Sequence, residues 1–195
     1  MCIRDRLYRT NAQSRLFEER FIASNIPYKI VGGVNFYSRK EVKDMLSYLK
    51  TIANGQDDLA VRRIINVPKR GIGATSITKV AIYAAEHEMN FYSALCEAAE
   101  IPGLGKAAAK IEPFVLFVQS MKAKSQLKPV SELLQEIIET TGYVRELEAE
   151  GTDEAEARIE NIDELISKAV DYEEAQEHPA LDGFLEEVAL VADID

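Results

Sequence analysis

The chain has 195 residues, of which 47% are hydrophobic and 29% are charged, the composition of an ordinary globular protein. No stretch is long and apolar enough to span a membrane, no secretory signal is visible, and Cys2 and Cys96 form neither a disulfide framework nor a metal-binding spacing. These features argue against a membrane-spanning or disulfide-stabilised protein and favour a reducing, cytoplasmic environment.

The net charge of −10 is unevenly distributed along the chain. Residues 1–126 contain 19 Lys and Arg against 12 Asp and Glu, a net charge of +7, whereas residues 127–195 contain 4 against 21, a net charge of −17. A chain divided in this way can present a basic face to a polyanion although it is acidic as a whole. The acidic half is also typical of solvated helical surface.

The first part of the chain predicts a fragment of an α/β domain. Residues 1–6 fit no element, and we interpret them as an extraneous or truncated leader. Leu7 to Arg9 predicts the end of a strand, and Tyr28 to Val31 predicts a second strand. Gly32 and Gly33 mark the predicted domain boundary. The helix expected between the strands has an apolar face of Leu16, Phe17 and Phe21.

Beyond that boundary every segment predicts helix. The first helix is expected from about Arg39 to Ile52, with an apolar face of Val42, Met45, Leu46, Leu49 and Ile52. Its opposite face is expected to carry Lys40, Lys43, Ser47 and Lys50. Such a stripe could follow a phosphate backbone or could simply solvate the helix. We interpret Asp57 and Asp58 as caps of the next helix, not as catalytic carboxylates.

The segment around Gly71-Ile72-Gly73 predicts a tight turn that leads into a helix. Thr75 and Ser76 are expected as N-caps of that helix. Backbone N–H groups at such a helix start attract anions, phosphate above all, and Lys69 and Arg70 would add positive charge. The same pattern also fits a plain corner between two helices.

The same device recurs at Gly103-Leu104-Gly105, which precedes an alanine-rich helix. Three further apolar stripes predict helices in the acidic half. They consist of Val130, Leu133, Leu134, Ile137 and Ile138, then Ile162, Leu165, Ile166 and Ala169, and finally Phe184, Leu185 and Val188.

The sequence contains no motif of a catalytic centre. There is no Gly-x-x-x-x-Gly-Lys-Ser/Thr phosphate loop, no His-Glu-x-x-His and no Gly-x-Ser-x-Gly, and only two histidines are present. We therefore predict neither catalytic nor metal-ligating residues in this chain.

Several strings, in this order, closely resemble UvrD/PcrA-type superfamily 1 DNA helicases. They are Leu7-Tyr-Arg-Thr-Asn-Ala-Gln-Ser-Arg15, Ile26-Pro-Tyr-Lys-Ile-Val-Gly-Gly33 with Phe36, Arg39, Glu41, Lys43 and Asp44, Val67-Pro-Lys-Arg-Gly-Ile-Gly73 and Arg158-Ile-Glu-Asn161. The resemblance covers essentially everything from Leu7 onward. It implies that residues 7–31 are part of the second RecA-like motor domain (2A), and that residues 32–195 are most of its mainly helical insertion (2B), with helix-hairpin-helix elements.

The resemblance also implies a function for the parent protein, that of an ATP-dependent 3′→5′ DNA helicase in repair or replication, in the bacterial cytoplasm at the nucleoid. ATP and Mg²⁺ would bind segments that carry the Walker motifs, so this fragment is expected to bind neither and to be inactive alone. The expected partners are single-stranded and duplex DNA and possible repair or replication proteins, but no membrane. An alternative assigns the helical domain a regulatory or protein-interaction role, because its acidic half repels DNA.

Site residues follow from the resemblance position by position. Arg9, Asn11 and Lys50 match positions that contact the single strand, and so does Asn35, although the family commonly has lysine there. The element that grips the duplex matches Lys69, Arg70, Gly71, Ile72, Gly73, Ala74, Thr75 and Ser76. On local pattern alone, Arg9 would pair with a carboxylate and Asn11 would cap a helix.

Overall fold

The structure, a computed structural model, describes residues 5–31 and 33–192. Within these ranges the chain is helical and contains no strand. The α-helices are α1 Ser14–Ala23, α2 Lys40–Ala53, α3 Asp58–Ile64, α4 Ala74–Glu86, α5 Phe91–Cys96, α6 Ala108–Ser125, α7 Val130–Thr141, α8 Tyr143–Glu150, α9 Asp153–Ala175 and α10 Leu181–Ala192. Short 3-10 helices are η1 Asn11–Gln13, η2 Phe36–Ser38 and η3 Gly105–Ala107.

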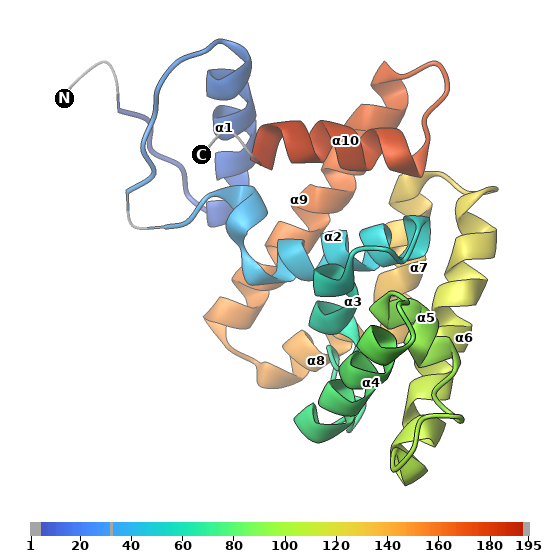
Figure 1. Cartoon of the computed structure of the whole chain (residues 1–195). Helices are drawn as coiled ribbons and strands as arrows, with labels where there is room; N and C mark the ends of the chain where they lie inside the picture. The colour runs from blue at the N-terminus through green and yellow to red at the C-terminus, as the bar shows by residue number, and fades with distance from the viewer. Residues whose placement is uncertain (1–4, 32, 193–195) are drawn as a thin grey trace.

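Helix α2 is the centre of the molecule (Figure 1). It contacts α3, α6, α7, α9 and α10, and its predicted apolar face is buried as expected. Its three lysines, Lys40, Lys43 and Lys50, are exposed. Ser47 was predicted on the same stripe but is buried, and its hydroxyl donates to the Lys43 carbonyl at 2.7 Å. Because helices cover α2 on several sides, only its lysines remain available to solvent partners.

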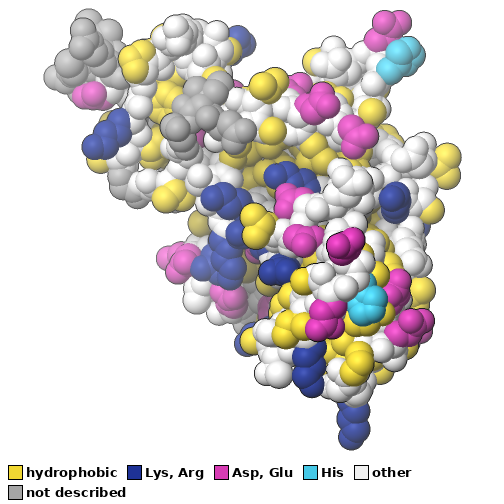
Figure 2. Space-filling view, viewed as in Figure 1, with side chains coloured by type: hydrophobic (Ala, Val, Ile, Leu, Met, Phe, Trp, Pro, Cys, Tyr) yellow, Lys and Arg dark blue, Asp and Glu magenta, His cyan; other side chains and the backbone are white. Residues whose placement is uncertain are grey.

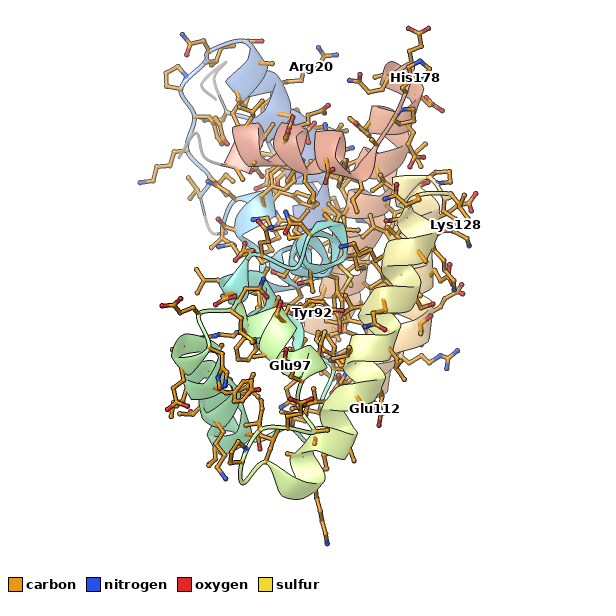
Figure 3. The ribbon with its side chains drawn as sticks, turned by 45° about the vertical axis from the view of Figure 1, so that its right-hand side comes forward. Arg20, Tyr92, Glu97, Glu112, Lys128 and His178 are labelled. Carbon is orange, nitrogen blue, oxygen red and sulfur yellow. The ribbon has the colours of Figure 1, made fainter. Side chains whose placement is uncertain are left out.

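Two glycine-containing connections lie at one end of this helical body. The first glycine turn, residues 66–73, joins α3 to α4, and the second glycine turn, residues 98–105, follows α5 and leads into η3 and α6. Helices α4 and α5 contact each other, and the Tyr83 hydroxyl donates to the Glu97 carboxylate at 2.9 Å. Figure 3 places Glu97 between α4 and α6. Helix α4 and the first turns of α6 form the lower end of the molecule in Figure 1.

The acidic half forms α7, α8, α9 and α10. The three predicted apolar stripes supply buried residues of α7, α9 and α10, so these helix predictions are confirmed. Helix α9 has 23 residues and contacts α2, α7, α8 and η1. Among the described helices, none combines the length and the apolar composition needed to cross a membrane.

The predicted strands are not formed. Residues 7–10 and 26–31 lie outside regular structure, and no described segment pairs with either of them. A strand needs a neighbour that accepts and donates its backbone hydrogen bonds, and β-prone residues alone do not supply one. The β-α-β fragment is therefore absent from the described residues. The predicted boundary includes Gly32, which lies outside them, as do residues 1–4 of the predicted leader.

Helix α1 matches its predicted apolar face only in part, because Phe17 and Phe21 are half-buried. Its expected apolar residue Leu16 is 55% exposed, and the fully buried side chains are Ser14, Arg15 and Glu18. The Arg15 guanidinium donates to Glu164 at 2.6 Å and to Asp171 at 3.0 Å, both on α9. Helix α1 therefore contacts the rest of the molecule through paired charges. Burial of polar groups in this way requires that each finds a partner.

Candidate nucleic-acid interface

The first glycine turn has the geometry that its sequence predicts. Gly71 has φ +69°, a left-handed conformation that favours glycine. Ile72, only 1% exposed, inserts into the apolar core and fixes the turn to the body of the protein. Gly73 is the N-cap residue of α4, which begins at Ala74. The helix therefore starts earlier than predicted, and Thr75 and Ser76 lie in its first turn rather than at the cap.

The backbone amides at the start of α4, those of Gly73, Ala74 and Thr75, belong to exposed residues and have no hydrogen-bond acceptor among the described residues. The Gly73 carbonyl accepts the N–H groups of Ser76 at 3.0 Å and Ile77 at 3.2 Å, which orients the first turn. A Cβ atom built on Gly73 would meet nothing within 4 Å. An anion can therefore approach these amides at the positive end of the helix dipole.

The Asn66 side chain holds the turn through hydrogen bonds to its backbone. Its side-chain oxygen accepts the N–H groups of Arg70 at 2.8 Å and Ile72 at 3.2 Å. Two amides of the turn are thereby satisfied internally, and those of Gly73 to Thr75 remain free for a ligand. Asn66 was not among the predicted site residues, although an Asn that precedes Pro and Gly is typical of side-chain-stabilised turns.

Arg70 is placed differently from the prediction. Its guanidinium donates to the carbonyls of Ile64 at 2.8 Å and Ile65 at 3.2 Å, and to the Tyr48 hydroxyl at 2.6 Å. It also lies over the Phe114 ring, 5.2 Å from its centroid. These contacts direct the charge inward, so the side chain supports the turn and does not reach outward to a phosphate. A guanidinium with five donors can satisfy several carbonyls at once.

Tyr48 completes the support under the turn. Burial raises the pKa of Tyr48, although the Arg70 guanidinium acts in the opposite direction. The phenol therefore stays protonated and donates to the Val67 carbonyl at 2.5 Å. Lys69, the neighbour of Arg70, is exposed. Figure 2 shows Lys and Arg side chains projecting from the lower end of the molecule, the end that carries α4 and the start of α6.

The residues predicted to contact the single strand lie before and in η1, just before η2, and near the end of α2. Arg9 is exposed before η1, and Asn11 begins η1 with a side chain that lies outside the described part. Lys50 lies near the far end of α2 from η2, about 15 Å along the axis from Lys40. Its ammonium is 3.9 Å from the Asp57 carboxylate.

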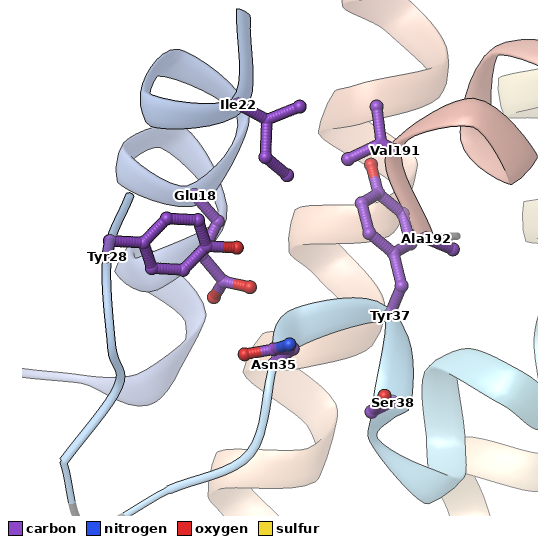
Figure 4. Close-up of a pocket in the computed structure, with 8 residues that line it drawn as sticks. All are labelled: Glu18, Ile22, Tyr28, Asn35, Tyr37, Ser38, Val191 and Ala192. Carbon is purple, nitrogen blue, oxygen red and sulfur yellow. The ribbon is translucent and has the colours of Figure 1, made fainter. Parts of the chain in front are cut away.

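Asn35 shares a pocket with one carboxylate, that of Glu18. With Glu18, Tyr28 and Tyr37 it lines a narrow pocket between α1 and α10 (Figure 4). The Glu18 carboxylate accepts the Phe36 N–H at 3.0 Å, and its second oxygen is buried without a partner. A carboxylate that lines the same pocket disfavours a phosphate at Asn35, since like charges repel.

Comparison with known proteins agrees with the sequence resemblance. The family model of the UvrD-like helicase C-terminal domain matches residues 5–195. The chain is 47% identical over 191 residues to the ATP-dependent DNA helicase PcrA of Staphylococcus aureus strains Mu50 and NCTC 8325. It is 45% identical over 191 residues to PcrA of Staphylococcus epidermidis strain ATCC 35984. Each match covers 97% of this chain and 26% of the relative.

The chain thus spans about a quarter of the length of the curated relatives it matches. The family match covers all of the described residues, including α1 and both glycine turns. This chain belongs to the UvrD-like helicase family, and its sequence corresponds to the C-terminal domain of that family.

Proposed function

We propose that this chain is the part of an ATP-dependent DNA helicase that grips duplex DNA ahead of a fork, and that the first glycine turn is the grip. The observation that carries the proposal is the row of open amides at Gly73, Ala74 and Thr75 at the start of α4. Backbone amides bind phosphate oxygens and do not read bases, so the grip acts on any sequence. A translocating enzyme requires such sequence independence.

The surroundings of the turn suit this role. Lys69 is exposed and adds a positive charge beside the open amides. Ile72, Asn66 and Arg70 hold the turn from the protein side, through burial and hydrogen bonds. In this proposal Lys69 contacts the DNA phosphate, and Arg70 holds the turn in place. A preorganised turn loses little conformational entropy when a phosphate binds.

The finer assignments of the parent protein are part of the same proposal. Residues 7–31 belong to motor domain 2A and residues 32–195 to insertion domain 2B, while ATP and Mg²⁺ bind segments that this chain does not contain. Closure of the motor domains moves the single strand in the 3′→5′ direction past Arg9 and Asn11. Lys50 is a further single-strand contact, and Asn35, beside Glu18, is the weakest of the four.

Duplex binding by the 195-residue chain tests the proposal. A fluorescent duplex with a 3′ single-stranded tail is titrated between about 50 and 200 mM salt, where phosphate contacts produce a steep loss of affinity. Gly73→Ala should weaken binding, because its methyl group obstructs the approach to the amides and meets no protein atom within 4 Å. Lys69→Gln should lower the salt slope by about one.

Two controls make the outcome decisive. Lys122→Gln removes an exposed lysine from the far end of α6 and should leave the affinity nearly unchanged. Thermal unfolding should show that Gly73→Ala is as stable as the wild type. Duplex binding that is equally strong in Gly73→Ala and in the wild type would refute the amide grip. Absence of any salt-dependent binding would favour the regulatory, protein-interaction alternative, in which residues 127–195 face a partner protein.

A further inference from the structure

The two glycine turns are joined by an exchange of lysines. The Lys110 ammonium, on α6, donates to the carbonyl of Gly71 in the first glycine turn at 2.9 Å. The Lys79 ammonium, on α4, donates to the carbonyl of Gly103 in the second glycine turn at 2.5 Å. Each helix that begins after one turn therefore supplies a lysine to the other turn. Residues 39 and 24 positions apart in the sequence are joined in this way.

The contact to Gly71 fixes one peptide group at both ends. The carbonyl of the Gly71–Ile72 peptide accepts from Lys110, and its N–H donates to Asn66 at 3.2 Å. An uncovered carbonyl oxygen at this exposed position would present negative partial charge beside the open amides. The ammonium covers that oxygen, so the surface of the turn is positive rather than mixed in sign. In the second glycine turn, the Lys79 ammonium likewise covers the carbonyl oxygen of Gly103.

Lys110 retains capacity for a ligand. The residue is exposed, and an ammonium has three N–H donors, of which one is used by the Gly71 carbonyl. Its nitrogen lies 3.0 Å from the position that a Cβ atom on Gly71 would take, so the charge sits directly on the turn. A phosphate at the open amides would thus meet a positive charge delivered from α6.

We propose that Lys110 both positions the Gly71–Ile72 peptide and contacts a phosphate of the duplex, with Lys79 as its counterpart at Gly103, and that the exchange makes the two glycine turns one positively charged surface for a phosphate backbone. This inference rests on the proposed function, since it assigns residues to the same site. It adds helix α6 and the second turn to a grip that the sequence places in residues 69–76 alone.

Charge removal at Lys110 tests the inference against a matched variant on the same helix. Lys110→Met and Lys122→Met each remove one exposed lysine of α6, but Lys122 lies near its other end. Lys110→Met should bind the tailed duplex about eightfold more weakly at 0.1 M salt, with a salt slope lower by about 0.9, the loss of one neutralised phosphate. Lys122→Met should behave like the wild type, and Lys110→Arg should restore both affinity and slope.

Hydrogen exchange, measured without DNA, tests whether Lys110 positions the Gly71–Ile72 peptide. Hydrogen exchange at the Ile72 amide should accelerate in Lys110→Met and remain slow in Lys110→Arg and Lys122→Met. Among the described residues, only Lys110 donates to the carbonyl end of that peptide. Unchanged exchange in Lys110→Met would overturn the positioning role.

The binding outcomes separate this inference from the proposed function. If Gly73→Ala weakens binding while Lys110→Met and Lys122→Met bind equally well, the amide grip stands and the lysine exchange has no part in it. If the wild-type chain shows no salt-dependent duplex binding, both proposals fail together.

Discussion

The two glycine turns share one sequence spacing and differ in what supports them. Beneath the first turn, Asn66 and Arg70 bind its backbone, whereas the corresponding positions of the second turn are Ala98 and Pro102, which offer no polar side chain. Gly73 has φ −77° and leads directly into α4. Its counterpart Gly105 has φ +53° and begins η3.

This difference shows that two turns of the same sequence spacing can leave different backbone amides unpaired. The glycines and one buried apolar residue, Ile72 or Leu104, are sufficient to turn the chain and attach it to the core. They do not determine which amides stay open. In the second turn the Ala107 N–H already donates to the Leu104 carbonyl at 3.1 Å. Among the described residues, the first turn therefore leaves an N–H group unpaired whose counterpart in the second turn is bonded, and its polar support can be tested directly.

The largest expected effect is at Arg70. Arg70→Ala should reduce the free energy of unfolding by about 3 kcal/mol, because several carbonyls and the Tyr48 hydroxyl lose a donor and Phe114 loses its cation contact. Pro102→Ala, at the matching position, should cost below about 1 kcal/mol. Urea unfolding measures both. Equal losses would mean that each turn is held by its apolar residue alone.

A smaller effect is expected at Asn66. Asn66→Ala should cost about 2 kcal/mol, since the N–H groups of Arg70 and Ile72 lose their common acceptor. Asn66→Asp keeps an oxygen at that position and should recover most of the stability. Thermal unfolding of the two variants provides the comparison, and identical loss in both would contradict a role as acceptor.

The smallest effect contrasts two glycines. A Cβ atom on Gly73 or on Gly105 meets nothing within 4 Å, so only the backbone conformation differs. Gly105→Ala should cost about 1 kcal/mol, because alanine is strained at φ +53°. Gly73→Ala should change the unfolding free energy by less than about 0.5 kcal/mol. Only Gly73→Ala should weaken duplex binding. The two equivalent glycines would then differ, one affecting stability and the other DNA binding.

Periodicity predicted the helical part of the fold well. The apolar stripes of α2, α7, α9 and α10 became the core, because each stripe has one possible buried face. Asp57 accepts the Ala60 N–H at 3.0 Å, as expected of a cap residue. The glycine at position 71 adopts the left-handed conformation that its turn requires.

The parts that could not be predicted depend on distant partners. Arg15 is buried because Glu164 and Asp171 lie against it, and no local pattern indicates residues about 150 positions away. Lys69 and Arg70 are adjacent and equally basic, yet one is exposed and the other binds carbonyls beneath the turn. The predicted strands at residues 7–9 and 28–31 have favourable composition but find no pairing edge among the described residues.

The ion pairs between α1 and α9 determine what is exposed to water if α1 undocks from the rest of the protein. Arg15 is 3% exposed and surrounded by carboxylates, so undocking α1 returns these ions to water and recovers hydration that docking had removed. An apolar contact would instead expose hydrophobic surface to water when the two parts separated. The N-terminal segment is thus joined to the body by a contact whose separation would expose charged groups to water, in contrast to the apolar core around α2.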